Sequence, residues 1–295
     1  MTTSFGLTRR DGDPWIALAF SPTRPRAGAE GDAAILQFLG RHEYPAERLA
    51  TDDAVSAFDD STVLVTRFVP GGPLPRPSVT RAARSSPSCG DLLGRLHTLP
   101  FDESVSRPGG ASGDDPSREG SPRQDLIAAL AFLDAAEDAA ETKVAPAERE
   151  RLEQLRDQVR TADDGQGLPE ALLHGNLLHA PDHVILGEQG PVAINWKAAG
   201  LGPRLADFAW LMWGTWGKAD WIDLAVGAYR QHVELTDDEF ERLEAVMYIR
   251  PLYLGCFSYR RDLMNGHPPS KEVWGFVNPK HIGAIAAATR AAYHR

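Results

Sequence analysis

The chain has 295 residues, of which 42% are hydrophobic, so it is long enough to bury a large core. Its formal net charge of -10 argues against nucleic acid as a partner, because nucleic-acid binders are usually basic. Two cysteines, Cys89 and Cys256, are too few for a disulfide framework and indicate a reducing compartment. The chain shows no apolar leader, and no apolar run approaches the roughly 20 residues that cross a bilayer. We therefore expect a cytoplasmic protein that binds neither nucleic acid nor a membrane.

The first 70 residues predict a small lobe that is rich in β-structure. Three stretches read as strands: residues 5–10, 15–20 and 63–69. An Asp-Gly turn joins the first two of them as a hairpin. Residues 30–39 have the apolar spacing of a helix. Residues 70–87, rich in proline, serine and arginine, predict irregular structure after this lobe.

The remainder, residues 71–295, predicts a larger lobe that is mostly helical. Apolar periodicity or an alanine-rich composition predicts helices at residues 89–99, 124–140, 147–161, 205–213, 220–233 and 282–293. Thr236 and Glu239 have the spacing of a capping box, which predicts the start of another helix that Pro251 is expected to break or kink. Residues 104–122 predict a flexible loop, because a stretch so rich in glycine, proline and serine cannot bury a core.

Polar residues cluster between residues 172 and 213, where they flank two short strand-like runs. The relevant segments are His174-Gly175-Asn176, Ile194-Asn195-Trp196 and Leu205-Ala206-Asp207. This stretch resembles the catalytic core of the aminoglycoside phosphotransferase family, a branch of the protein-kinase-like fold with the pattern H-G-D, then N or H, then I-D-W/F, then D-L-A. The segments VLVTRFVPGG and GDLLGRLHTLP resemble the hinge strand and the first large-lobe helix of that family.

The resemblance covers nearly the whole chain and implies an α+β, two-lobed, protein-kinase-like fold. Residues 1–70 would form a truncated N-lobe. Residues 71–295 would form a helical C-lobe that carries a degenerate catalytic hairpin.

The resemblance assigns roles to residues that differ from the family pattern. Asn176 stands where the catalytic carboxylate belongs, and an amide cannot accept a proton at neutral pH. Asn195 stands where the main metal-binding carboxylate belongs, although Mg²⁺ favours anionic oxygen. His183 takes the place of the second metal ligand. His179 and Asp182 lie near it in sequence, but this set does not make a convincing zinc site.

Two residues of the core keep supporting roles in this comparison. Asp207 resembles the acid that braces the catalytic loop through backbone hydrogen bonds, and His174 is expected to support the same loop. The tryptophans of this region are expected to belong mainly to the core.

The parts of the small lobe that would hold a nucleotide are incomplete. The hinge residues Arg67, Phe68 and Val69 would contact a nucleotide if one binds. Glu30 corresponds to the helix acid that normally pairs with a phosphate-contacting lysine, but the first lysine of the chain is Lys143. Arginines such as Arg9 or Arg24 are the small-lobe alternatives to that lysine. Only four residues precede Phe5, so there is no room for a further strand and a glycine loop.

Four catalytic elements of the family are thus altered: the general base, the metal-binding carboxylate, the phosphate-contacting lysine and the glycine loop. Such groups act together in phosphoryl transfer, so losing several of them removes the activity. We expect a pseudokinase, a scaffold, partner or ligand-binding component of a natural-product or peptide-modifying biosynthetic pathway. It would bind a protein or peptide, with a small-molecule ligand as a further option, and no cofactor is certain. One alternative is an active phosphotransferase that uses ATP and Mg²⁺ on an aminoglycoside, sugar or other small hydroxyl substrate. Another is a lyase or cyclase in the same cleft, with His179 or His183 as acid or base.

Overall fold

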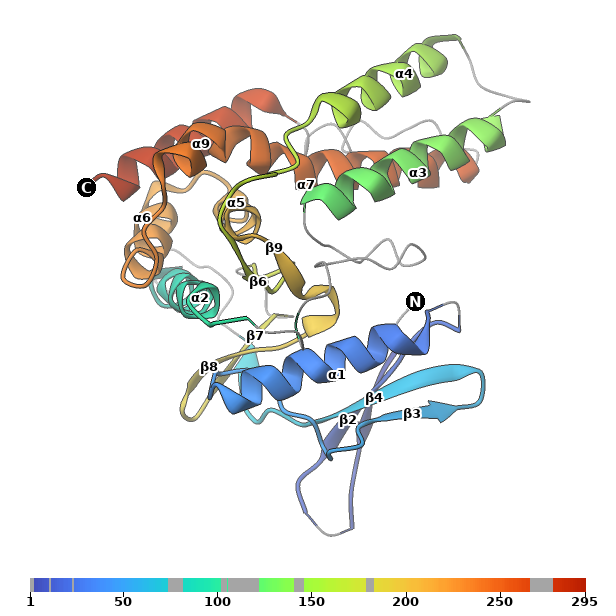
Figure 1. The fold of residues 1–295 in the computed structure, drawn as a ribbon, viewed down its shortest axis with the longest axis vertical. Helices are drawn as coiled ribbons and strands as arrows, with labels where there is room; N and C mark the ends of the chain where they lie inside the picture. Colours follow the sequence, from blue (N-terminus) through green and yellow to red (C-terminus); the bar gives the residue numbers. More distant parts are fainter. Residues whose placement is uncertain are drawn as a thin grey trace.

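The computed structural model describes residues 3–10, 12–22, 24–73, 82–101, 105, 122–140, 146–178, 183–265 and 278–295. Figure 1 shows a small lobe of strands with one helix, joined to a larger and mostly helical lobe. This is the predicted α+β organisation. The predicted loop at residues 104–122 lies outside the described residues, apart from residues 105 and 122.

The small lobe is a four-stranded antiparallel sheet with the order β1-β2-β4-β3. Its strands are β1 Thr3–Leu7, β2 Trp15–Ala19, β3 Val55–Phe58 and β4 Ser61–Arg67. The hairpin β1–β2 and the strand β4 were predicted. Strand β3 was not, because only Val55 among its residues is buried and the alternating pattern is therefore weak.

Helix α1, Arg26–Arg41, packs on this sheet and buries Ile35, Leu36, Phe38 and Leu39. The helix begins before the predicted start at residue 30. Its first turn has no buried apolar stripe apart from Ala29, so periodicity does not mark it. An exposed Arg26–Glu30 pair, with Nε 2.8 Å from Oε1, lies along that first turn at helical i, i+4 spacing.

A second, three-stranded sheet lies where the two lobes meet. Strand β5, Gly72–Pro73, pairs with β7, Val184–Gly187, which pairs in turn with β8, Gly190–Ala193. Residues of the small lobe also pair with the end of β8. The Ala193 N–H donates to the Pro45 carbonyl over 2.8 Å, and the Glu47 N–H donates to the Ala193 carbonyl over 3.0 Å. The two lobes are therefore joined by backbone hydrogen bonds as well as by the chain itself.

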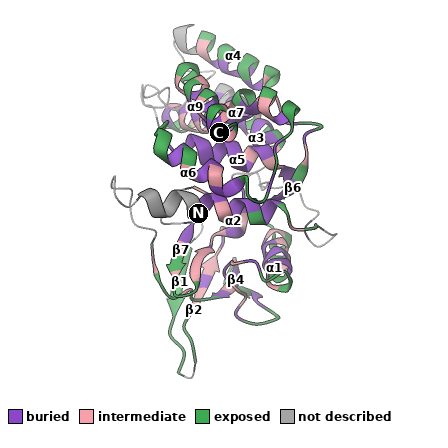
Figure 2. Cartoon of the chain, turned by 90° about the vertical axis from the view of Figure 1, so that its left-hand side faces the viewer, coloured by how far each residue is buried: buried purple, intermediate pink, exposed green. Residues whose placement is uncertain are grey.

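The large lobe surrounds a small two-stranded sheet of β6 and β9. Its elements are α2 Ala82–His97, α3 Pro122–Ala140, α4 Pro146–Thr161, β6 Glu170–Leu173, η2 Trp196–Ala198, β9 Gly200–Pro203, α5 Arg204–Trp213, α6 Ala219–Tyr229, α7 Asp237–Met264 and α9 Pro279–Tyr293. Helix α5 lies at its centre and is almost wholly buried, whereas the tip of the β1–β2 hairpin is exposed (Figure 2). Among the described residues, no helix combines the length and the hydrophobicity that a bilayer crossing requires.

Two helix boundaries test the sequence rules directly. The capping box is present, because the Glu239 N–H donates to the Thr236 hydroxyl over 3.2 Å and the Thr236 N–H donates to the Glu239 carboxylate over 2.8 Å. Of the two outcomes expected at Pro251, the break is wrong, since α7 continues past it to Met264, and the kink stays a prediction. Residues on both sides of the proline, including Ile249 and Leu252, are buried against α3 and α4. That burial outweighs the hydrogen bond that proline cannot make.

Helix α2 also begins earlier than predicted, at Ala82 instead of Cys89. The apolar spacing that guided the prediction marks the buried positions from Cys89 onward. Cys89 and Cys256 are both buried free thiols, as expected from the low cysteine content.

Candidate functional site

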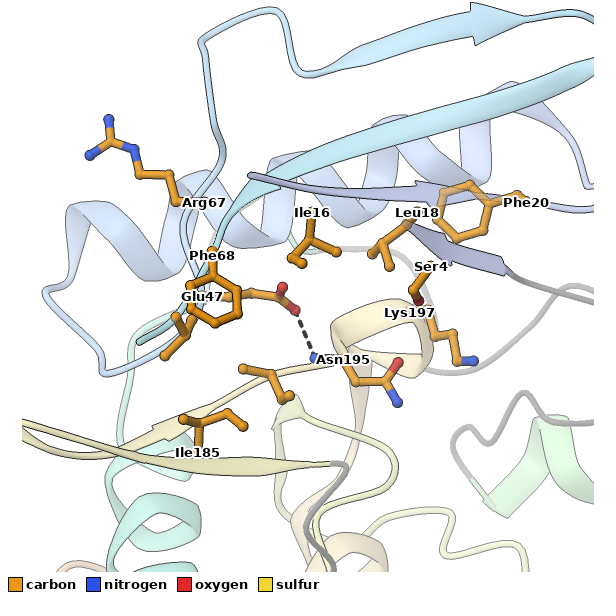
Figure 3. Close-up of a pocket in the computed structure, with 12 residues that line it drawn as sticks. Ser4, Ile16, Leu18, Phe20, Glu47, Arg67, Phe68, Ile185, Asn195 and Lys197 are labelled. Atoms are coloured by element: carbon orange, nitrogen blue, oxygen red, sulfur yellow. Dashed lines mark hydrogen bonds between the residues drawn. The ribbon is translucent and has the colours of Figure 1, made fainter. Parts of the chain in front are cut away.

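A pocket of about 470 Å³ lies between the small-lobe sheet and the β7–β8 hairpin (Figure 3). One wall comes from Ile16 and Leu18, which share one face of β2, and from Phe20, which directly follows the strand. The opposite wall is formed by Ile185 and Ile194. Apolar walls with a few polar groups are typical of small-molecule sites.

The predicted hinge residues Arg67, Phe68 and Val69 all line this pocket. The Phe68 N–H donates to the Pro14 carbonyl over 2.9 Å, so it is already used within the protein. The Arg67 guanidinium is exposed and directed away from the pocket (Figure 3). Of the two residues that follow Phe68, Val69 carries a backbone N–H and Pro70 has none.

The loop at His174, Gly175 and Asn176 is braced from two directions. The Asp207 carboxylate accepts the N–H of His174 over 2.6 Å and the N–H of Gly175 over 3.0 Å. From the other side, the Arg250 guanidinium donates to the Gly175 carbonyl. The backbone hydrogen bonds predicted for Asp207 are thus present in the structure.

Asp207 is held in its charged form. Burial raises its pKa, but the neighbouring His97, whose Nε2 lies 3.8 Å from Oδ2, and the His174 side chain and backbone N–H lower it by more, so the pKa lies below the ordinary value. A buried carboxylate that accepts backbone N–H groups is a stable support for a loop.

The side-chain amide of Asn176 is engaged at both ends. The Trp210 indole N–H donates to its Oδ1 over 3.0 Å, and because an indole can only donate, this contact fixes the orientation of the amide. The Nδ2 group then faces His183 Nε2 at 3.3 Å and donates to it. Asn176 is not among the residues that line the pocket.

Both histidines of this loop region are neutral. Burial, together with the neighbouring His174 ring and the Lys197 ammonium, lowers the pKa of His183 to about 3. Burial also lowers the pKa of His174. The His174 Nε2 lies 3.0 Å from the Ile194 carbonyl and donates to it, while Nδ1 accepts the Asn176 N–H over 3.3 Å. A general acid or base works best with a pKa near the operating pH, so His183 is poorly suited to that role. His179 lies outside the described residues.

The neutrality of His183 predicts a pH-dependent stability. Its ordinary pKa of 6.5 falls to about 3 in the folded state, so between these values the unfolded chain binds a proton that the folded chain does not. Stability therefore falls as the pH is lowered from about 6.5 toward 3. We expect His183→Gln to reduce this slope by about 1.4 kcal/mol per pH unit, measured by urea unfolding. The same change at the exposed His294 serves as the control, and an unchanged slope in His183→Gln would contradict the assignment.

Asn195 lies in the left-handed region, with φ 71° and ψ 57°, directly before the short helix η2. Its backbone N–H donates to the Glu47 carboxylate over 2.7 Å (Figure 3). Burial raises the pKa of Glu47, while the hydrogen bond from Asn195 partly opposes that rise. The Asn195 amide and the Lys197 ammonium extend toward the same side of the pocket (Figure 3).

The predicted metal pair, His183 and Asn195, does not make a Mg²⁺ site. His183 does not line the pocket, and its Nε2 accepts from Asn176. Among the described residues that line the pocket, Glu47 is the one carboxylate, and it accepts a hydrogen bond from the Asn195 backbone. Within the described ranges, no three His, Cys, Asp or Glu side chains gather as metal ligands. The donor set therefore does not fit a hard divalent cation, which favours several anionic oxygens.

Glu30 does not lie at the pocket. It is exposed on the first turns of α1 and pairs with Arg26. The inward-facing acid of α1 is Asp32, which shares a helical face with Ile35, Leu36 and Leu39. Asp32 pairs with Arg24 at 2.7 Å.

The two arginines proposed as lysine substitutes also lie elsewhere. The Arg24 guanidinium is buried against Asp32 and lies 4.0 Å from the centre of the Phe20 ring. The Arg9 guanidinium lies 4.3 Å from the Trp15 ring. Neither side chain lines the pocket.

Two charged pocket residues, Glu47 and Lys197, were missed from the sequence. Glu47 follows no periodic pattern, so nothing in the sequence indicates its burial. Lys197 had a usable signal, since it comes two residues after Asn195, but the phosphate-contacting lysine was expected in the small lobe. Among the tryptophans, Trp196, Trp210 and Trp213 are buried as expected, whereas Trp216 is 53% exposed.

A profile of the phosphotransferase enzyme family matches residues 5–245. The chain belongs to this family. The match includes the hinge, the loop at Asn176 and the segment at Asn195, so the pocket lies within the family's shared region. A search of curated proteins found no match.

Solved structures of kinases share the fold of this phosphotransferase-family chain. The amicoumacin kinase hAmiN superposes with a TM-score of 0.65 at 14% identity, covering 98% of this chain and 86% of the other. A choline/ethanolamine kinase family protein from Mesorhizobium loti superposes with a TM-score of 0.59 at 16% identity. The match covers 98% of this chain and 92% of the other. An aminoglycoside phosphotransferase from Alicyclobacillus acidocaldarius superposes with a TM-score of 0.57 at 14% identity. The match covers 99% of this chain and 91% of the other. The predicted two-lobed kinase-like fold is thus confirmed. At these identities, the likeness extends to the fold alone.

Proposed function

We propose that this phosphotransferase-family chain is a pseudokinase, which keeps the scaffold and a ligand pocket but does not carry out ordinary metal-dependent phosphoryl transfer. The observation that carries this proposal is the state of Asn176. Its amide oxygen accepts from Trp210 and its amide nitrogen donates to His183. A group of this kind holds the loop in place and has no basic atom to take a proton from a substrate hydroxyl.

The second support comes from the metal side of the pocket. Phosphoryl transfer depends on positioning and on neutralising the charge of the phosphates, which divalent ions usually do. Asn195 supplies no negative charge, and the Glu47 carboxylate is bonded to the backbone N–H of Asn195. Positions 176 and 195 both carry Asn in place of an acid, and both acids would serve the same phosphoryl transfer. Neither position can therefore compensate for the change at the other.

In this proposal, the chain acts in the cytoplasm as a scaffold, partner or ligand-binding component of a biosynthetic pathway. A net charge of -10 suits a basic peptide or protein as the partner. The pocket provides room for a small molecule in addition.

The test is a phosphotransfer assay with ATP and Mg²⁺ against aminoglycosides, sugars and amino alcohols. We expect no ADP above the rate of the blank. The double variant Asn176→Asp with Asn195→Asp is the matched comparison, and we expect it to gain Mg²⁺-dependent nucleotide binding, measured by calorimetry. Asp at position 176 fits the site, because Trp210 can still donate to it and His183 can shift its proton to Nε2.

Transfer by the natural chain to any of these acceptors would overturn the proposal in favour of an active phosphotransferase. Loss of such transfer in the double variant would show that the asparagines themselves take part in it.

A further inference from the structure

We infer that the pocket binds a nucleoside phosphate without a divalent metal ion, and that Lys197 contacts the phosphate directly. The inference rests on the proposed function, because it assumes a cleft from which the metal-binding charges have been lost. It concerns equilibrium binding, whereas the proposed function concerns turnover.

Among the described residues that line the pocket, Lys197 is the cation that faces into it. Three of the lining residues are charged: Glu47, Arg67 and Lys197. Arg67 is directed outward (Figure 3), and the Glu47 carboxylate is bonded to the Asn195 backbone. Lys197 is half-buried, and no ion pair joins it to any residue in the described part of the chain. An unpaired ammonium in a partly enclosed pocket favours an anionic ligand, because such a ligand restores the stabilisation that burial removes from the charge.

The amide of Asn195 makes the metal unnecessary for charge balance. A carboxylate at position 195 would repel a phosphate and would need a divalent cation between it and the ligand. The Asn195 amide carries no charge, so a phosphate meets little repulsion on this side of the pocket. A single lysine is then sufficient to attract it. Lys197 reaches the same side of the pocket as the Asn195 amide (Figure 3).

The rest of the pocket suits the heterocyclic end of the same ligand. Ile16 and Leu18 on one side and Ile185 and Ile194 on the other enclose an apolar space in which a flat ring can lie. Phe68 and the hinge lie at the opposite end from Lys197 (Figure 3), so a ring at the hinge would direct its phosphate toward the ammonium. The volume of about 470 Å³ falls within the range of small-molecule sites.

The test measures the binding of ADP and of uncharged adenosine by calorimetry, each in excess EDTA and in excess Mg²⁺. We expect ADP to bind equally well in both conditions and more tightly than adenosine. Lys197→Met should weaken ADP binding by about ten- to a hundredfold, as expected for a lost hydrogen bond to a charged group, and leave adenosine binding unchanged. Lys197→Arg should retain most of the affinity. Lys280→Met, at an exposed lysine outside the pocket, is the matched control.

Three results would overturn the inference: loss of ADP binding in EDTA, equal weakening of ADP and adenosine by Lys197→Met, or no binding of either compound. Thermal unfolding of each variant separates a folding defect from a binding defect, and Lys197→Arg keeps the test valid if the methionine variant unfolds. None of these results is phosphoryl transfer, so a failure of this inference is distinct from a failure of the proposed function.

Discussion

Alanine at Gly175 is expected to lower the free energy of unfolding by about 3 kcal/mol or more, the sum of a strained backbone and an overpacked contact. Gly175 has φ +82°, and an added Cβ would lie 2.6 Å from the Ala198 carbonyl oxygen and 2.9 Å from the Ala198 side chain. The loop cannot move away easily, because Asp207 and Arg250 hold it on both sides. Urea unfolding of the purified variant measures the effect.

Gly167 offers a matched control for this experiment. It has nearly the same φ, +83°, but nothing lies within 4 Å of the Cβ position. Gly167→Ala should therefore show only the cost of the left-handed backbone, about 1–2 kcal/mol. The difference between the two variants reports the contact with Ala198. Equal destabilisation would show that the loop relaxes around the added methyl group.

Alanine at Asp207 is expected to destabilise the fold by about 3–5 kcal/mol, because it leaves two buried N–H groups without an acceptor. These are the amides of His174 and Gly175, bonded to the carboxylate at 2.6 and 3.0 Å. Asp207→Asn keeps one acceptor oxygen and should show a smaller loss. If Asp207→Ala unfolded at the same urea concentration as the natural chain, the brace would have no energetic role.

The Asp207 variants also differ from the natural chain in their response to acid. The pKa of Asp207 is depressed below its ordinary 3.8, so the stability that it contributes is present above that value and is lost as the pH falls through the folded-state pKa. Asp207→Asn has no carboxyl group to titrate at this position. The stability difference between the natural chain and Asp207→Asn should therefore shrink below a pH of about 3.8.

Most of the fold follows from periodicity, because buried faces leave a regular pattern. The β1–β2 hairpin, strand β4 and the helices α3 to α5 were predicted close to their observed positions. The exceptions share a cause. The start of α1 and the exposed strand β3 bury few of their side chains, so no alternating or helical pattern marks them. At Pro251, packing on both sides of α7 overrides a local rule that is correct for an isolated helix.

The site was predictable where a motif carries it and not where tertiary contacts create it. The motif located Asn176, Asn195, Asp207 and the hinge. It did not locate Glu47, which reaches Asn195 across 148 positions of sequence. The resemblance also assigned the helix acid to Glu30, although the spacing of Ile35, Leu36 and Leu39 puts Asp32 on the buried face of α1.

The backbone pairing between residues 45–47 and β8 has a consequence for how the pocket selects ligands. Separation of the lobes would break two backbone hydrogen bonds at Ala193 and the bond from Asn195 to Glu47. The distance between the pocket walls is thus set before a ligand arrives. A ring system thicker than this distance would then be excluded from the pocket. A thinner one would gain no extra contacts, because the lobes would not close around it.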